Sequence, residues 1–91
     1  MFSRKIFGQR LLEIRKLNHE TQYDLAALLE VSKSRISEME NGKNTTTLEN
    51  FFLICEHYKV SADYLLGLSD NPHKPRTKKG AAATKRKEEP T

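Results

Sequence analysis

Apolar residues recur along most of the chain with the three-to-four-residue spacing of helices, and no stretch alternates with a period of two. In the first stretch Phe7, Leu11 and Ile14 are separated by polar side chains. Four shorter apolar stretches follow, centred near residues 27, 37, 53 and 65. The pattern predicts an all-α fold of five helices around one hydrophobic core.

Short polar side chains divide these stretches at positions that suit helix termini. Thr21, Ser32, Thr47 and Ser61 each precede an apolar stretch and are predicted N-caps. Asp24 lies three residues after Thr21, which is the spacing of a capping box. Asn41-Gly42 and Gly67 are predicted ends of the third and fifth helices, and the fourth helix is predicted near Leu48–Lys59.

The last two helices supply several residues to the predicted core. The fourth offers several large apolar side chains for the core, and Cys55 is interpreted as a core thiol. Aromatic residues are expected to pack in the core and not to form base-stacking surfaces. The predicted core residues of these helices are Leu48, Phe51, Phe52, Ile54, Cys55, Tyr58 and Tyr64.

Composition and charge divide the 91 residues into two parts. Residues 1–70 carry nine Lys/Arg against ten Asp/Glu, a net of −1, and residues 71–91 carry seven against two, a net of +5; together they give the chain's net +4. No large apolar residue occurs after Asp70. We therefore predict a folded domain over 1–70 and a disordered basic tail over 71–91.

The central segment carries a specific ordered pattern: Gln22-x-x-Leu25-Ala26, then Ser32-x-x-x-Ile36-Ser37 and Glu40-x-Gly42. It resembles the phage-repressor-like (Cro/CI, Xre-type) helix-turn-helix family of DNA-binding proteins. The resemblance extends over about residues 7–67 and implies a compact five-helix lambda-repressor-like domain, with the helix-turn-helix at about residues 21–41.

Three positions depart from the family's pattern. Glu30 and Lys59 stand where glycine is common, and Thr46 stands where proline is common. A non-glycine residue at positive φ costs about 1–2 kcal/mol. We expect these turns to be less stable or differently shaped, without a change of fold.

The resemblance implies that the third helix enters the major groove of DNA. At 100° per residue, Ile36 and Met39 point inward, whereas Ser34, Ser37, Glu38 and Asn41 face outward. A polar helix face is by itself usually a solvated surface, and only the motif makes DNA contact the stronger interpretation. The candidate base-reading residues are Lys33, Ser34, Ser37 and Glu38.

Other polar residues are candidates for contacts that set register without reading sequence. Gln22 lies in the first turn of the second helix, where backbone amides suit a phosphate oxygen. The full set of predicted phosphate contacts is Arg10, Gln22, Arg35, Asn41 and Lys43. By the resemblance, Arg15 and Glu40 form a structural ion pair between the first and third helices.

The sequence offers no pattern for catalysis or metal binding. His19, His57 and His73 lie in unrelated segments, and Cys55-x-His57 lacks two further ligands at zinc spacing. We expect no enzymatic activity, cofactor or metal. Without a signal sequence, a long apolar segment or a cysteine pair, a cytoplasmic protein with no membrane contact is expected.

The resulting hypothesis is a sequence-specific transcriptional regulator, preferentially a repressor, that binds a pseudo-palindromic double-stranded DNA operator as a homodimer. Leu65, Leu66 and Leu68 are the predicted dimer surface. The alternative is an antitoxin or antirepressor that uses the same scaffold to hold a protein partner. The basic tail has three interpretations: a solubilising end, an electrostatic arm on DNA, or a segment that folds on a partner.

Overall fold

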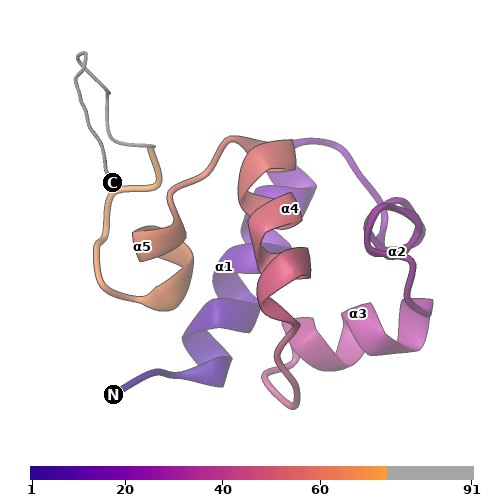
Figure 1. The fold of residues 1–91 in the computed structure, drawn as a ribbon, viewed down its shortest axis with the longest axis horizontal. Helices are drawn as coiled ribbons and strands as arrows, with labels where there is room; N and C mark the ends of the chain where they lie inside the picture. Colours follow the sequence, from indigo (N-terminus) through magenta and orange to yellow (C-terminus); the bar gives the residue numbers. More distant parts are fainter. Residues whose placement is uncertain (74–91) are drawn as a thin grey trace, which may run out of the picture.

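The computed structural model describes residues 1–73, and they form five helices. These are α1 (Arg4–Leu17), α2 (Gln22–Leu29), α3 (Lys33–Glu40), α4 (Leu48–Tyr58) and α5 (Ala62–Leu66). The predicted all-α fold is confirmed (Figure 1). None of these helices combines the length and apolar composition needed to cross a membrane. The predicted disorder after His73 lies outside the described residues.

Each helix within residues 1–73 is preceded by a serine or threonine whose side chain satisfies a backbone amide of the first turn. The side chains of Thr21, Ser32, Thr47 and Ser61 accept from the amide three residues later, as predicted. Ser3 does the same for α1 and was not predicted. In the Thr21–Asp24 capping box, the two reciprocal bonds measure 3.1 and 2.8 Å.

Three helices end in the left-handed conformation. Gly67 closes α5 at φ 85°, whereas Glu30 closes α2 at φ 57° and Lys59 closes α4 at φ 54°. Glu30 and Lys59 are the two positions at which the sequence lacks the family's glycine. Both therefore adopt the glycine-type geometry with a side chain present, at a cost in backbone free energy.

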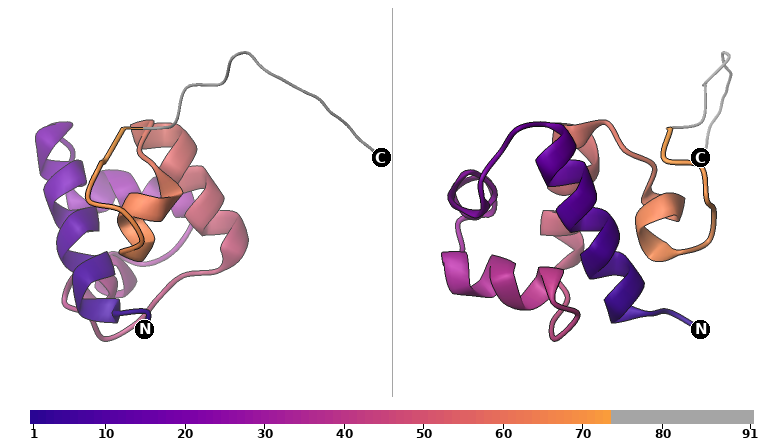
Figure 2. Two further views of the ribbon diagram at one scale, coloured as in Figure 1. Left: turned by 90° about the vertical axis from the view of Figure 1, so that its left-hand side faces the viewer. Right: turned by 180° about the vertical axis from the view of Figure 1, so that it is seen from behind.

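α1 packs against α3 and α5, and α2 packs against α3 and α4. The core lies between these helices. Figures 1 and 2 show α2 and α3 at one end of the molecule and α5 at the other, with α1 between them. The buried apolar residues are Phe7, Leu11, Ile14, Leu25, Ala26, Leu29, Ile36, Met39, Ile54, Cys55, Tyr58, Val60 and Leu65.

The structure corrects three of the predicted positions. Leu48 and Phe52 were expected in the core but are 80% and 62% exposed, because they lie one turn apart on a different face of α4 from the buried Ile54. Leu65 was expected on an exposed dimer surface but is completely buried. Apolar spacing alone does not indicate which of two apolar faces is covered.

The chain after α5 returns to the start of that helix. The amide of Ser61 donates to the carbonyl of Pro72 at 2.9 Å, and Val60 forms an isolated β-bridge with His73. Residues 71–73 are therefore part of the fold, three residues beyond the predicted boundary. The backbone of Ser61 is extended, which leaves its amide outside the hydrogen bonds of α5 and available for this pairing.

Candidate nucleic-acid interface

Two short helices, α2 and α3, are joined by a tight turn at Glu30–Ser32. The amide of Val31 donates to the carbonyl of Ala26 at 3.0 Å, which closes the end of α2. Ser32 then caps α3 through the amide of Arg35. The buried side chains of Leu25, Leu29 and Ile36 belong to the same core. The relative orientation of α2 and α3 is therefore fixed by packing and by two helix ends.

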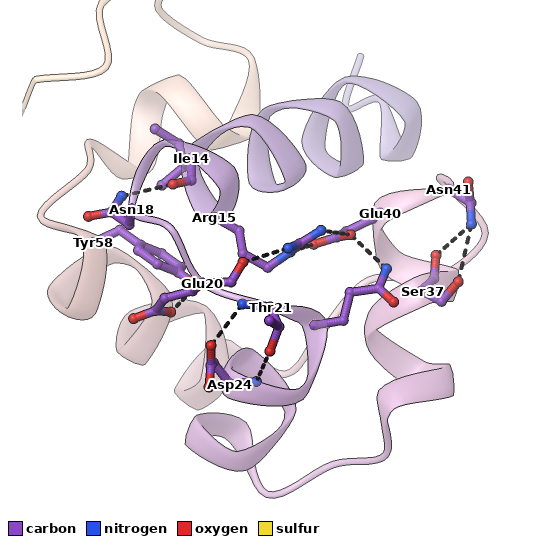
Figure 3. Close-up of polar contacts among 11 residues, drawn as sticks. Ile14, Arg15, Asn18, Glu20, Thr21, Asp24, Ser37, Glu40, Asn41 and Tyr58 are labelled. Carbon is purple, nitrogen blue, oxygen red and sulfur yellow. Dashed lines mark hydrogen bonds and ion pairs between the residues drawn. The ribbon is translucent and has the colours of Figure 1, made fainter.

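The predicted ion pair between Arg15 and Glu40 is present. Arg15 Nε lies 2.7 Å from Glu40 Oε2, and Arg15 Nη2 lies 3.1 Å from Glu40 Oε1. Figure 3 shows Arg15 reaching from α1 to Glu40 at the end of α3. Both residues are buried, and the bond to Glu40 raises the pKa of Arg15. The charged pair anchors α3 to α1 at its C-terminal end.

Gly8 allows α1 and α3 to approach closely beside the Arg15–Glu40 pair. A Cβ atom at Gly8 would lie 2.3 Å from the carbonyl oxygen of Met39 and 2.8 Å from that of Glu40. Only a residue without a side chain permits this approach. Gly8 was not singled out in the sequence because it lies within a regular helix, where its role depends on a distant segment.

A second polar cluster joins the α1–α2 loop to α4. Glu20 accepts from the hydroxyl of Tyr58 at 2.9 Å, and its other oxygen lies 2.8 Å from His57 Nε2. The backbone carbonyl of Glu20 also accepts from Arg15 at 2.7 Å. Burial, followed by the bond to Glu20, raises the pKa of Tyr58. This cluster was missed because Glu20 lies in a loop without a recognisable pattern.

The four predicted base-reading residues share the surface of α3. Lys33, Ser34 and Glu38 are exposed and Ser37 is half-buried, whereas Ile36 and Met39 are inside the core. The structure therefore brings the four side chains together on one helix whose opposite face is anchored. Their contact with bases stays a prediction.

The predicted phosphate contacts are divided between two regions. Arg35 and Lys43 are exposed near the two ends of α3. Gln22 donates to Glu40 Oε1 at 3.0 Å, and Asn41 donates to the carbonyl of Ser37 at 2.8 Å (Figure 3 shows Asn41). These four residues lie on or beside the helix-turn-helix.

Arg10 differs from the others because its guanidinium faces α5. It donates to the carbonyls of Tyr64 and Ser69 at 2.6 and 2.8 Å and to Asp70 at 2.9 Å. Its Cζ atom also lies 4.2 Å from the centre of the Tyr64 ring. The structure does not bring Arg10 to the group on α3, and its donors are used to hold α5 and the following segment.

Two residues near the base-reading candidates were missed. Tyr23 on α2 is 69% exposed, and Lys33 Nζ lies 5.5 Å from the centre of its ring. Asn44, in the loop after α3, donates to a carboxylate oxygen of Glu38. Neither contact has a sequence signal, because each depends on the conformation of long side chains from two elements.

Comparison with known proteins assigns the chain to a family. Residues 11–65 match a helix-turn-helix family model of the Xre/Cro-CI type. The chain therefore belongs to this family of transcriptional regulators, which in general are not enzymes.

Individual relatives agree with this assignment. An uncharacterized HTH-type transcriptional regulator of Bacillus subtilis (strain 168), YobD, is 33% identical over 67 residues, which are 74% of this chain and 60% of the relative. The antitoxin PezA of Streptococcus pneumoniae is 27% identical over 62 residues, 68% of this chain and 39% of the relative. The chain thus spans less than two thirds of the length of these relatives.

A solved structure is also similar. The P22 c2 repressor, in complex with a synthetic operator, superposes with a TM-score of 0.65 and 28% identity over 70% of this chain and 97% of that one. The lambda-repressor-like fold class is confirmed by this similarity.

Proposed function

We propose that this protein is a sequence-specific DNA-binding repressor that inserts α3 into the major groove of its operator. The observation that carries the proposal is the division of α3 into an exposed polar face and a buried face, anchored to α1 by the Arg15–Glu40 pair. A rigid helix with an exposed polar face fits the groove and presents hydrogen-bonding groups to base edges. The similarity to a repressor whose structure contains operator DNA supports it.

The proposed base contacts follow from side-chain chemistry. Lys33 donates to the N7 and O6 acceptors of guanine, and Glu38 accepts from the N4 amino group of cytosine. Ser34 and Ser37 can donate or accept. All four lie on the exposed or half-exposed surface of α3.

The proposed phosphate contacts are Gln22, Arg35, Asn41 and Lys43. Arg35 lines a hollow beside the capped start of α4, together with Thr47 and Asn50. Gln22 lies in the first turn of α2, where the helix dipole favours an anion. We leave Arg10 out of this set because its donors face α5.

We further propose a homodimer on a pseudo-palindromic site, with two copies of α3 about one helical turn, roughly 34 Å, apart. Leu66 and Leu68 remain candidates for the dimer surface, and Leu65 is excluded by its burial. Leu68 is 74% exposed, and Phe2 beside it is 46% exposed. Sedimentation with and without DNA tests this part, and a monomer at high micromolar concentration in both states contradicts it.

Selection of bound duplexes from a random DNA pool tests the main proposal. We expect a recovered consensus of two related half-sites and an affinity that falls steeply with salt. Recovery of no consensus, with the full chain folded and concentrated, contradicts sequence-specific binding. Because the positive excess lies after residue 73, truncation there is expected to reduce the salt slope if the tail is an electrostatic arm.

A second candidate function is that of an antitoxin-type module that holds a protein. The specific observation in its favour is the 27% identity to the antitoxin PezA. The two functions make different demands on the surface of α3. Binding to an operator requires its exposed polar face, whereas holding a protein partner does not. If alanine at Lys33 and Ser34 leaves binding to every duplex unchanged, the second candidate is favoured.

A further inference from the structure

Glu38 places a negative charge on a helix face that is proposed to enter a groove lined by phosphates. Its side chain is exposed, and within residues 1–73 it forms no ion pair. Its one polar side-chain contact there is with Asn44, whose Nδ2 lies 2.5 Å from Glu38 Oε1. An exposed glutamate has several rotamers, so a base contact by this residue requires something to select one of them.

Asn44 lies in the loop between α3 and α4, and the start of α1 holds this loop in place. Gly42 has φ 77°, and a Cβ atom there would lie 3.0 Å from the Cα of Lys5. Arg4 donates to the carbonyl of Lys43 at 3.3 Å, and the amide of Lys43 donates to the carbonyl of Glu38 at 2.9 Å. The start of α1 therefore fixes the loop that carries Asn44.

The chemistry of this donor matters as much as its position. An amide donates a hydrogen bond to one oxygen without adding a positive charge, whereas lysine or arginine would neutralise the carboxylate. With Oε1 bonded to Asn44, Oε2 and the net negative charge remain available. An amino group at a base edge is the donor that such a carboxylate accepts.

We propose that Asn44 is a positioning residue for sequence recognition: it orients the Glu38 carboxylate so that its second oxygen accepts from a base amino group, that of cytosine. This inference rests on the proposed function and adds a specificity determinant outside α3. Asn44 acts through Glu38, and no contact of its own with DNA is required.

The experiment compares base preference at each position of a selected duplex for the full-length protein, four single variants and the double variant Glu38→Gln/Asn44→Ala. Glu38→Gln removes the charge, Asn44→Ala removes the donor, and Asn44→Asp replaces it by a group of the same shape that repels Glu38. Thr45→Ala is the matched control, because it is the exposed next residue in the same loop. Thermal melting of each variant verifies that it is folded.

We expect Glu38→Gln to remove the preference at one position of each half-site. Asn44→Ala should reduce discrimination at that same position by roughly three- to tenfold, and Asn44→Asp by more, with the other positions unchanged. Asn44→Ala should add nothing in the Glu38→Gln background. Thr45→Ala should match the wild type.

Three results would overturn the inference, and they separate it from the proposed function. If Glu38→Gln alters one position and both Asn44 variants leave it unchanged, the inference fails and the proposed function stands. An equal loss at all positions for Asn44→Ala also overturns it, because a general structural role would then explain the effect. Absence of specific binding by the wild type overturns both.

Discussion

The two faces of α3 differ in almost every physical respect. On the inner face Ile36 and Met39 are buried, and Glu40 forms a bidentate pair with Arg15. On the outer face Lys33 and Glu38 are exposed and make single contacts with neighbouring elements. The comparison indicates that the inner face determines where the helix lies, whereas under the proposed function the outer face determines which bases it recognises. Stability and sequence preference should therefore respond to separate substitutions.

The largest effect is expected for Arg15→Ala on the inner side. Removal of one partner leaves the Glu40 carboxylate buried with only Gln22 as a side-chain donor, which should lower the free energy of unfolding by about 3–5 kcal/mol. Chemical denaturation of purified protein measures this loss. Arg4→Ala is the control, because Arg4 makes one exposed bond and should change stability by less than about 0.5 kcal/mol. Equal effects of the two substitutions would contradict the anchoring role of the pair.

The next effect is expected for Gly8→Ala. The added methyl group would overlap the carbonyl oxygens of Met39 and Glu40, so α1 and α3 must separate. We expect a loss of about 3 kcal/mol in unfolding free energy, at the upper end for overpacking, together with weaker DNA binding. Gly67→Ala is the comparison variant. A Cβ atom at Gly67 would lie no closer than 3.8 Å to its nearest neighbour, so this substitution tests positive-φ strain without overlap. A Gly8→Ala protein with wild-type stability would show that the close approach does not position α3.

The helix ends and the ion pair that fix the fold were more accessible to sequence reasoning than the side-chain contacts on the outer face of α3. Four N-caps, the turn residues Glu30 and Lys59, and the Arg15–Glu40 pair were predicted because local chemistry or a family pattern specifies them. The Tyr23–Lys33 and Asn44–Glu38 contacts were not, because rotamers of residues from different elements decide them. Leu48 and Leu65 were misplaced because periodicity defines an apolar face without its covering partner.

On the outer face, Lys33→Ala is expected to leave stability unchanged and to weaken binding to the selected duplex. The loss should be roughly 1–3 kcal/mol, with relaxed preference at one guanine. Tyr23→Leu should give a smaller loss at the same position, because the ring that faces the Lys33 ammonium is removed. Titration of duplexes that vary at each position measures both. A uniform loss over all positions would assign Lys33 to the phosphates instead.

The contact between Tyr58 on α4 and Glu20 predicts that the stability of the fold depends on pH. Burial raises the pKa of Tyr58 in the folded state above its ordinary value of 10.0, so the folded state retains this proton more strongly. The free energy of unfolding that this proton contributes is fully present below about pH 10, the pKa of tyrosine in the unfolded chain. It is lost as the pH rises from there through the pKa of Tyr58 in the folded state. Tyr58→Phe should remove this alkaline loss, as measured by denaturation between pH 8 and pH 11. Tyr23→Phe, at an exposed ring, should retain it.

The smallest effect is expected at the turn that joins α2 to α3. Glu30 adopts φ 57°, which costs about 1–2 kcal/mol for a residue with a side chain, while glycine adds about 0.5–1 kcal/mol of unfolded-state entropy. Glu30→Gly should therefore stabilise the fold by about 0.5–1 kcal/mol.

Lys59→Gly, at φ 54° in a turn distant in sequence from α3, is the matched variant and should give a similar gain. If Glu30→Gly gains stability but alters base preference whereas Lys59→Gly does not, the α2–α3 turn also sets the geometry of the outer face. The separation between the two faces of α3 would then hold for its packing against α1 but not for its connection to α2.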